Sequence, residues 1–157
     1  GASVQREIRS RRLAQAIGLL QQLPGKRLFQ YRDDAGKLCS VGRRDVNEFL
    51  YTTAGARIPL QDFRTRLAST SVLEILAHIP PAKSERMRRR QILDAVRAAA
   101  ADLANTPAVC RRSYVHDTIF AAFENGALKR FSSKLKLCRS STGREQVLAQ
   151  IVASAAH

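Results

Sequence analysis

The feature that most constrains this chain is the helical spacing of its apolar residues, interrupted at a few proline and glycine positions. Apolar residues recur every three to four positions in several segments, which is the period of an amphipathic helix. Pro24–Gly25, Gly55, Pro80–Pro81 and Gly126 interrupt the pattern, as residues that end helices do. The chain is therefore expected to be mainly α, with short and medium-length helices.

The apolar period and the end signals place these helices along the chain. Asp117 and Thr142 are expected to cap two of them, because their side chains accept hydrogen bonds from the first free backbone amides of a helix. The predicted segments are residues 10–23, a short helix at Val46–Leu50 that ends before Gly55, a helix from Pro59, residues 84–104, a helix from Thr106–Pro107, Asp117–Phe123, and a last helix that follows a capping box at Thr142–Glu145.

One short β ribbon is expected beside the helices. Leu28–Tyr31 and Lys37–Val41 flank the polar link Asp33–Gly36, which has the composition of a hairpin turn. Val4–Ile8 is a candidate for extending the ribbon. The chain has 157 residues, 45% of them hydrophobic, and neither a repeat nor a linker, so residues 1–157 are expected to form a single domain, mainly α with a minor β ribbon.

The charge balance points to a polyanionic partner. The chain carries 27 Lys and Arg residues against 13 Asp and Glu residues, a formal net charge of +14. Basic side chains that contact phosphates release condensed counterions, so duplex DNA is the expected partner. The alternative is a generally basic, solvated surface. Arg86–Arg90 and Lys129–Lys136 are the two basic segments that a polyanion would contact.

Other classes of protein are less compatible with this composition. No apolar run approaches the roughly 20 residues of a membrane span, so a soluble, cytoplasmic protein is expected. With DNA as the expected partner, the protein is also expected to be nucleoid-associated, and it is expected to be a monomer. Cys39, Cys110 and Cys138 lack the spacing of a zinc site and are expected to be reduced thiols. Neither a metal nor a cofactor is expected. Cys110 is expected to be a packing residue, because the sequence shows no base that would activate it.

Two stretches carry the chemistry of this chain. One is Leu103–His116, which contains Asn-Thr-Pro-Ala-Val-Cys-Arg-Arg-Ser-Tyr, and the other is Gln61–Thr65, with the sequence Gln-Asp-Phe-Arg-Thr. Together they resemble the C-terminal catalytic domain of type IB DNA topoisomerases of the bacterial and poxvirus kind. The resemblance spans residues 4–128 and includes Leu23–Gly25, Leu28–Tyr31 and Asp45–Asn47. It implies the helical catalytic core that these enzymes share with tyrosine recombinases.

The resemblance implies that Tyr114 is a nucleophile. In that family a tyrosine hydroxyl attacks a DNA phosphodiester and stays on the 3′ phosphate, and the nick is resealed after the duplex swivels, so supercoils relax without ATP or metal. Arg64 matches the arginine that grips nonbridging oxygens with its planar fork. Asn105, nine residues before Tyr114, stands where many relatives have histidine and is expected to donate a hydrogen bond to the same phosphate. His116 is expected to contact DNA or to cap a turn.

The resemblance also implies two groups without a match in this sequence, an upstream arginine and a lysine that acts as general acid. Gly1–Val4 lies where the lysine-bearing turn would be. The chain is therefore expected to be a C-terminal fragment of a larger enzyme, weakly active or inactive by itself. Lys26 and Lys37 are the nearest lysines, and Ala104 replaces a glycine that is more usual in relatives.

Two other functions stay open. A tyrosine recombinase or integrase has the same covalent chemistry, but typically shows a histidine two or three residues before its second arginine, where this chain has Gln61 and Asp62. The other is a noncatalytic basic DNA-binding module. In that case Tyr114 is a half-buried packing residue, Arg64 is a helix-surface arginine paired with Asp62 or another acid, and Asn105 is only a helix C-terminus or turn residue.

Overall fold

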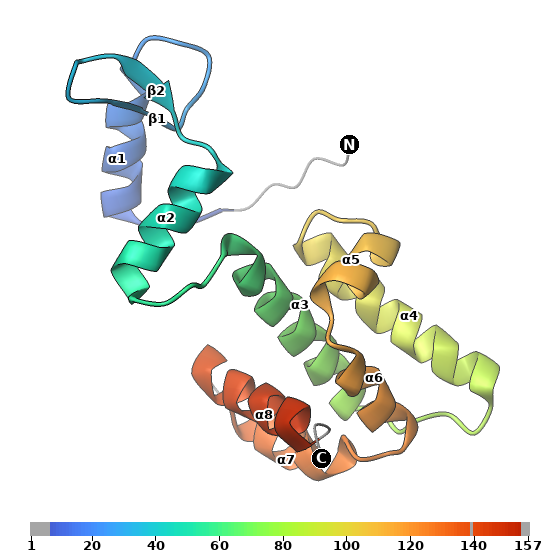
Figure 1. Ribbon diagram of the computed structural model, residues 1–157. Coiled ribbons are helices and arrows are strands. Elements are labelled where there is room, and N and C mark those ends of the chain that lie inside the picture. Colours follow the sequence, from blue (N-terminus) through green and yellow to red (C-terminus); the bar gives the residue numbers. More distant parts are fainter. Residues whose placement is uncertain (1–6, 139, 155–157) are drawn as a thin grey trace. The chain divides into compact units, whose positions relative to one another are not determined.

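The computed structural model describes residues 7–138 and 140–154 (Figure 1). It confirms the mainly α fold with a minor β ribbon, and each predicted helical segment is present. The elements in chain order are α1 (Arg11–Gln21), β1 (Gln30–Arg32), β2 (Leu38–Ser40), α2 (Arg43–Ala54), α3 (Leu60–Ala77), α4 (Glu85–Asp102), α5 (Pro107–Tyr114), α6 (Asp117–Glu124), α7 (Lys129–Leu137) and α8 (Ser141–Ser154).

The described residues form two compact units, one up to residue 60 and one from residue 61 onward. The first unit holds α1, the two strands and α2, and the second holds the helices α3 to α8. The expectation of one catalytic domain over residues 1–157 stays a prediction. Residues 4–6 of the candidate ribbon extension, and the Gly1–Val4 turn, lie outside the described residues.

Local end signals organise the first unit. The Ser10 side chain caps α1 by accepting a hydrogen bond from a backbone amide of the first turn (3.3 Å). The two strands pair antiparallel with Tyr31 opposite Cys39, and the Asp33 carboxylate accepts hydrogen bonds from two amides of the connecting turn. α2 ends at Gly55, whose φ of 64° is the left-handed conformation that glycine adopts without strain. The predicted hairpin is confirmed, and α2 ends before Gly55 as predicted, whereas α1 ends at Gln21, two residues before the predicted end at residue 23.

The second unit contains a hydrophobic core to which its helices contribute. α3 supplies six of the buried residues, and α5 packs on α4. The core side chains that are nearly or completely inaccessible to solvent include Val72, Leu73, Leu76, Ile92, Val96, Cys110, Ile119, Phe123, Leu128, Leu135, Val147 and Ile151. Leu135 belongs to α7, which the sequence analysis identifies only as a basic segment and not as a helix.

A tight turn follows α4 and carries part of the sequence motif. The amide of Asn105 donates to Ala100 O (2.9 Å) and that of Ala104 to Ala101 O (3.2 Å), which is the Schellman pattern of a helix end. Ala104 has a φ of 53°. An alanine is strained in this left-handed region and a glycine is not, so Ala104 occupies the position where glycine is the usual residue.

The cap of α6 differs from the prediction. The sequence predicts Asp117 as the capping residue, but His116 occupies that position, and its Nδ1 accepts a hydrogen bond from Thr118 N (3.4 Å). Asp117 is the first helical residue, where a carboxylate interacts favourably with the helix dipole. The imidazole nitrogen can accept a hydrogen bond as a carboxylate does, so the cap lies one residue earlier. Of the two roles left open for His116, the structure shows the capping role.

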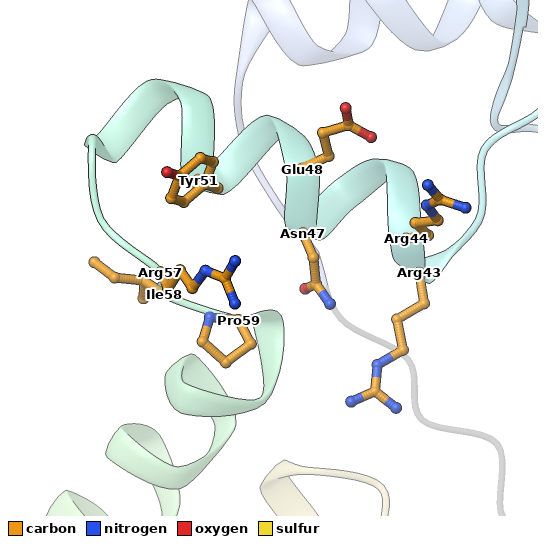
Figure 2. Close-up of a pocket in the computed structure, with 8 residues that line it drawn as sticks. All are labelled: Arg43, Arg44, Asn47, Glu48, Tyr51, Arg57, Ile58 and Pro59. Carbon is orange, nitrogen blue, oxygen red and sulfur yellow. The ribbon is translucent and has the colours of Figure 1, made fainter.

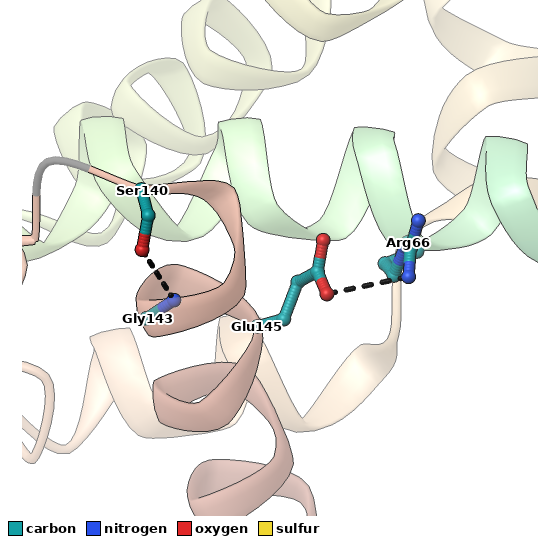
Figure 3. Close-up of polar contacts among 4 residues, drawn as sticks. All are labelled: Arg66, Ser140, Gly143 and Glu145. Carbon is teal, nitrogen blue, oxygen red and sulfur yellow. Dashed lines mark hydrogen bonds and ion pairs between the residues drawn. The ribbon is translucent and has the colours of Figure 1, made fainter.

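The predicted capping box of the last helix is also wrong. The Ser140 hydroxyl, not that of Thr142, accepts a hydrogen bond from Gly143 N (3.3 Å; Figure 3), and Thr142 lies inside α8. Glu145, the other half of the predicted box, forms an ion pair with Arg66 of α3 (Oε2 to Nη1, 3.2 Å). A contact between helices thus replaces the local one that the sequence pattern indicates.

Candidate active site

Tyr114 lies in the last turn of α5, and its side chain is half-buried against the core of the second unit. As predicted, α5 begins at Pro107, and the Thr106 hydroxyl accepts a hydrogen bond from Val109 N (3.3 Å). The helix ends after Tyr114 because Val115 is extended (φ −112°, ψ 130°) with a buried side chain. The tyrosine is therefore held at the junction of two helices rather than along a free helix surface.

Arg64 lies in the second turn of α3 and faces Tyr114. Its guanidinium carbon is 4.9 Å from the centroid of the Tyr114 ring, a cation–π distance. Its Nη2 donates a hydrogen bond to Leu103 O (3.0 Å), at the end of α4. In the part of the chain that the structure describes, Arg64 is partly buried and forms no ion pair with Asp62, so the pairing with Asp62 is wrong. One side chain joins α3, the end of α4 and the end of α5.

Two buried nitrogen atoms in this region have no hydrogen-bond partner among the described residues. They are Nε of Arg64 and Nδ2 of Asn105. A buried donor without an acceptor costs about 1–3 kcal/mol, more when it is charged, and such groups are normally paired with protein, water or a ligand. Arg64 is tied to Leu103, two residues before Asn105, so both donors belong to one small region. A cationic and a neutral donor with free hydrogens fit the oxygens of an anion such as a phosphate.

Cys110, one turn before Tyr114 on α5, is completely buried and has a free thiol. Burial raises the pKa of this thiol, while the charge of Arg64 acts in the opposite direction. Thiolates, and not thiols, are the reactive form of cysteine. The structure therefore agrees with the prediction that Cys110 is a packing residue.

The structure also shows two contacts at this site that the sequence does not reveal. One is the backbone carbonyl of Leu103, whose position depends on the turn after α4 and not on its side chain. The other is Ser69 of α3, whose Oγ bonds both Tyr114 O and His116 N (3.1 Å each). The only sequence signal for Ser69 is a small polar residue at a position of α3 that the apolar period assigns to the core.

The first unit has a basic pocket of about 900 Å³ between α2 and the segment that precedes α3 (Figure 2). Figure 2 shows Arg43 and Asn47 projecting from α2 toward the side on which Arg57 and Pro59 lie. The Asn47 Oδ1 accepts a hydrogen bond from the backbone amide of Leu60, the first residue of α3 (2.9 Å). This bond links the end of the segment to α2. The lining residues are Arg43, Arg44, Asn47, Glu48, Tyr51, Arg57, Ile58 and Pro59, three arginines against one carboxylate.

The other candidate groups are less informative. Lys26 and Lys37 belong to the first unit and are exposed, and neither is assigned as the general acid. Among residues 7–138 and 140–154, no three His, Cys, Asp or Glu side chains lie close enough together to hold a metal ion. Within the same residues, no helix combines the length and the apolar content that crossing a bilayer requires.

Comparison with known proteins adds independent information. The family model described as eukaryotic DNA topoisomerase I, catalytic core, matches residues 3–141. The chain is also similar to a DNA topoisomerase 1B of Acanthamoeba polyphaga mimivirus, with 29% identity over 116 residues. That match covers 69% of this chain and 34% of the relative, so the chain spans about a third of the length of the curated relative it matches.

Proposed function

Because the chain belongs to the family of the eukaryotic DNA topoisomerase I catalytic core, we propose that it is a catalytic part of a type IB DNA topoisomerase. It would relax supercoiled duplex DNA through a transient 3′-phosphotyrosyl break in one strand. One structural observation carries the proposal. The guanidinium of Arg64, with a buried and unpartnered Nε, lies 4.9 Å from the ring of Tyr114.

The Tyr114 hydroxyl is the nucleophile in this reaction. Its oxygen forms a bond to the phosphorus and loses its proton, while the bond from phosphorus to the 5′ oxygen breaks and that oxygen takes up a proton. The phosphodiester link to tyrosine keeps the energy of the broken bond, so the reverse attack by the 5′ hydroxyl reseals the strand without ATP.

Arg64 and Asn105 stabilise the transition state. Negative charge accumulates there on the nonbridging phosphate oxygens, and donors that are fixed in advance stabilise it without reorganising. Nε of Arg64 and Nδ2 of Asn105 are buried donors without a partner among the described residues, and one nonbridging oxygen accepts from each. The hydrogen bond from Arg64 to Leu103 O holds the guanidinium at the junction of three helices before DNA binds.

Duplex DNA is the substrate that the charge distribution favours. The basic pocket of the first unit presents Arg43, Arg44 and Arg57, and an open hollow on α4 presents a second group of arginines. Ion pairs with Glu85 and Asp94 neutralise only part of the α4 charge. We also propose that the protein is associated with cellular DNA in the nucleoid and that it is a monomer.

A covalent-adduct experiment tests the proposal. A duplex whose scissile 5′ oxygen is replaced by sulfur needs no proton on its leaving group, so its cleavage depends only on the nucleophile and the phosphate clamp. On denaturing gels this chain is expected to form a covalent adduct with that substrate. Tyr114→Phe should abolish the adduct and keep the noncovalent affinity, whereas the matched controls Tyr31→Phe and Tyr51→Phe should behave like the unmodified chain. An adduct that persists in Tyr114→Phe refutes the assignment.

The same experiment separates the alternatives. A noncatalytic DNA-binding module gives no adduct with either the sulfur or the oxygen substrate. A tyrosine recombinase gives an adduct only on its own target sequence, whereas the proposed topoisomerase acts on plasmids of unrelated sequence. No observation on the described residues favours either alternative over the proposed function.

A further inference from the structure

Ser69 is a buried polar residue in an otherwise apolar part of the core. Its exposure is 1%, and among the described residues only Ser69 and Gln30 are both polar and buried. Its Oγ donates a hydrogen bond to Tyr114 O (3.1 Å) and accepts one from His116 N (3.1 Å). The hydroxyl therefore uses its one proton and one of its lone pairs on the backbone at either side of Val115.

These two backbone groups lie at a break between helices. Tyr114 O is the last carbonyl of α5, and His116 N belongs to the cap of α6, with the extended residue Val115 between them. Helix ends leave such groups without partners inside their own helix. The Ser69 hydroxyl supplies both partners from α3, so it fastens the α5–α6 junction to that helix.

The same helix also carries Arg64. Ser69 lies five positions after Arg64, which is about 7.5 Å along a helix axis at 1.5 Å per residue. Arg64 contacts the ring of Tyr114, and Ser69 contacts its backbone. α3 therefore contacts Tyr114 at two points, at its aromatic ring through Arg64 and at its backbone carbonyl through Ser69.

We propose that Ser69 is a positioning residue, which fixes the backbone of Tyr114 relative to Arg64 so that the phenol oxygen meets the phosphate that Arg64 holds. This inference rests on the proposed function. A displacement of about 1 Å between reacting groups can cost on the order of 100-fold in rate. Loss of the bridge frees the α5–α6 junction to move, so the rate of strand cleavage should fall while the basic surfaces that bind DNA stay unchanged.

The test compares Ser69→Ala with three matched variants. Ser69→Thr keeps the hydroxyl at the same position. Thr70→Val removes the next hydroxyl on α3, which is buried and has no hydrogen-bond partner in the described part of the chain. Val72→Ala opens a space in the core, since Val72 is completely buried, without touching the bridge. The measurements are the single-turnover rate of adduct formation on the sulfur substrate, the noncovalent Kd for the same duplex, and hydrogen exchange at the His116 amide.

Ser69→Ala is expected to slow adduct formation by about 10- to 100-fold, with the Kd within about twofold of the unmodified chain. The rate of hydrogen exchange at the His116 amide should rise in Ser69→Ala and stay unchanged in Thr70→Val. Ser69→Thr should recover most of the rate, and Thr70→Val and Val72→Ala should keep it.

An unchanged rate in Ser69→Ala overturns the inference, and so does a Val72→Ala chain that is slowed equally, because the effect would then be general destabilisation. Absence of an adduct with the unmodified chain is a different result, since it contradicts the proposed function itself.

Discussion

Replacement of Ala104 by glycine is expected to raise the stability of the second unit. Ala104 has a φ of 53°, in the left-handed region that costs an alanine about 1–2 kcal/mol. Glycine avoids this strain, but its freer unfolded chain offsets about 0.4–1 kcal/mol of the gain. The side chain of Ala104 is exposed, so its removal leaves no cavity. The net increase in the free energy of unfolding should be about 0.5–1 kcal/mol.

The matched control is Ala101→Gly, three residues earlier. Ala101 is also exposed but lies within α4, so glycine there should lower the free energy of unfolding by about 0.5–1 kcal/mol. Urea titration followed by circular dichroism measures both effects. Thermal melting should show Ala104→Gly shifted upward by about 1–4 °C, given the size of the chain. The Schellman bonds of Ala104 and Asn105 use backbone groups only and are retained in the variant.

The two variants should therefore change stability in opposite directions. A loss of stability in Ala104→Gly comparable to that in Ala101→Gly would show that residue 104 is not strained in solution. The turn that carries Asn105 would then differ from the one described, and the placement of its amide at the phosphate site would lose its basis.

Arg64→Ala should raise the activation free energies of cleavage and religation together by about 2–4 kcal/mol, because the same side chain stabilises the one transition state that both reactions pass through. If single-turnover rates stay unchanged and only the Kd for DNA rises, Arg64 is a simple DNA contact. Duplex binding should weaken by orders of magnitude between about 50 and 200 mM salt, with little sequence preference, as counterion release requires; fluorescence anisotropy across that range measures it, and a flat profile would contradict the assignment of the basic surfaces. Burial raises the pKa of Cys110 above its ordinary 9.0, so the folded chain keeps a proton that the unfolded chain loses at alkaline pH. The free energy of unfolding should therefore fall as the pH rises through 9.0, and it should fall less steeply in Cys110→Ala.

The sequence predicts most of the fold because its helix ends carry strong local signals. Gly55 and Thr106–Pro107 mark helix ends that the structure confirms, since a left-handed glycine and a capping hydroxyl act through the neighbouring backbone. The two wrong caps show where local signals fail. His116 replaces Asp117 as the cap because an imidazole nitrogen accepts the same kind of hydrogen bond. Glu145 forms an ion pair with Arg66, on a helix that is far away in sequence, instead of completing a capping box at the start of its own helix.

The candidate site is predictable in part for a related reason. Tyr114, Arg64 and Asn105 stand out through a resemblance in sequence, and the structure brings all three to the end of α4 and α5. The groups that hold them do not stand out. A carbonyl such as Leu103 O carries no side-chain identity, and Ser69 is recognisable only once the α5–α6 junction is seen to lie beside it.

The most direct test of the central claim is to locate the covalent bond on the chain. After reaction with a sulfur-containing duplex and removal of most of the DNA by nuclease, trypsin releases Ser113–Lys129, in which Tyr114 is the single tyrosine. Mass spectrometry should find this peptide carrying a nucleotide remnant linked through its 3′ phosphate, with the fragment ions placing the added mass on Tyr114. A remnant on Leu28–Arg32 or Asp45–Arg57, which hold the other two tyrosines, or a 5′ linkage, would contradict the account.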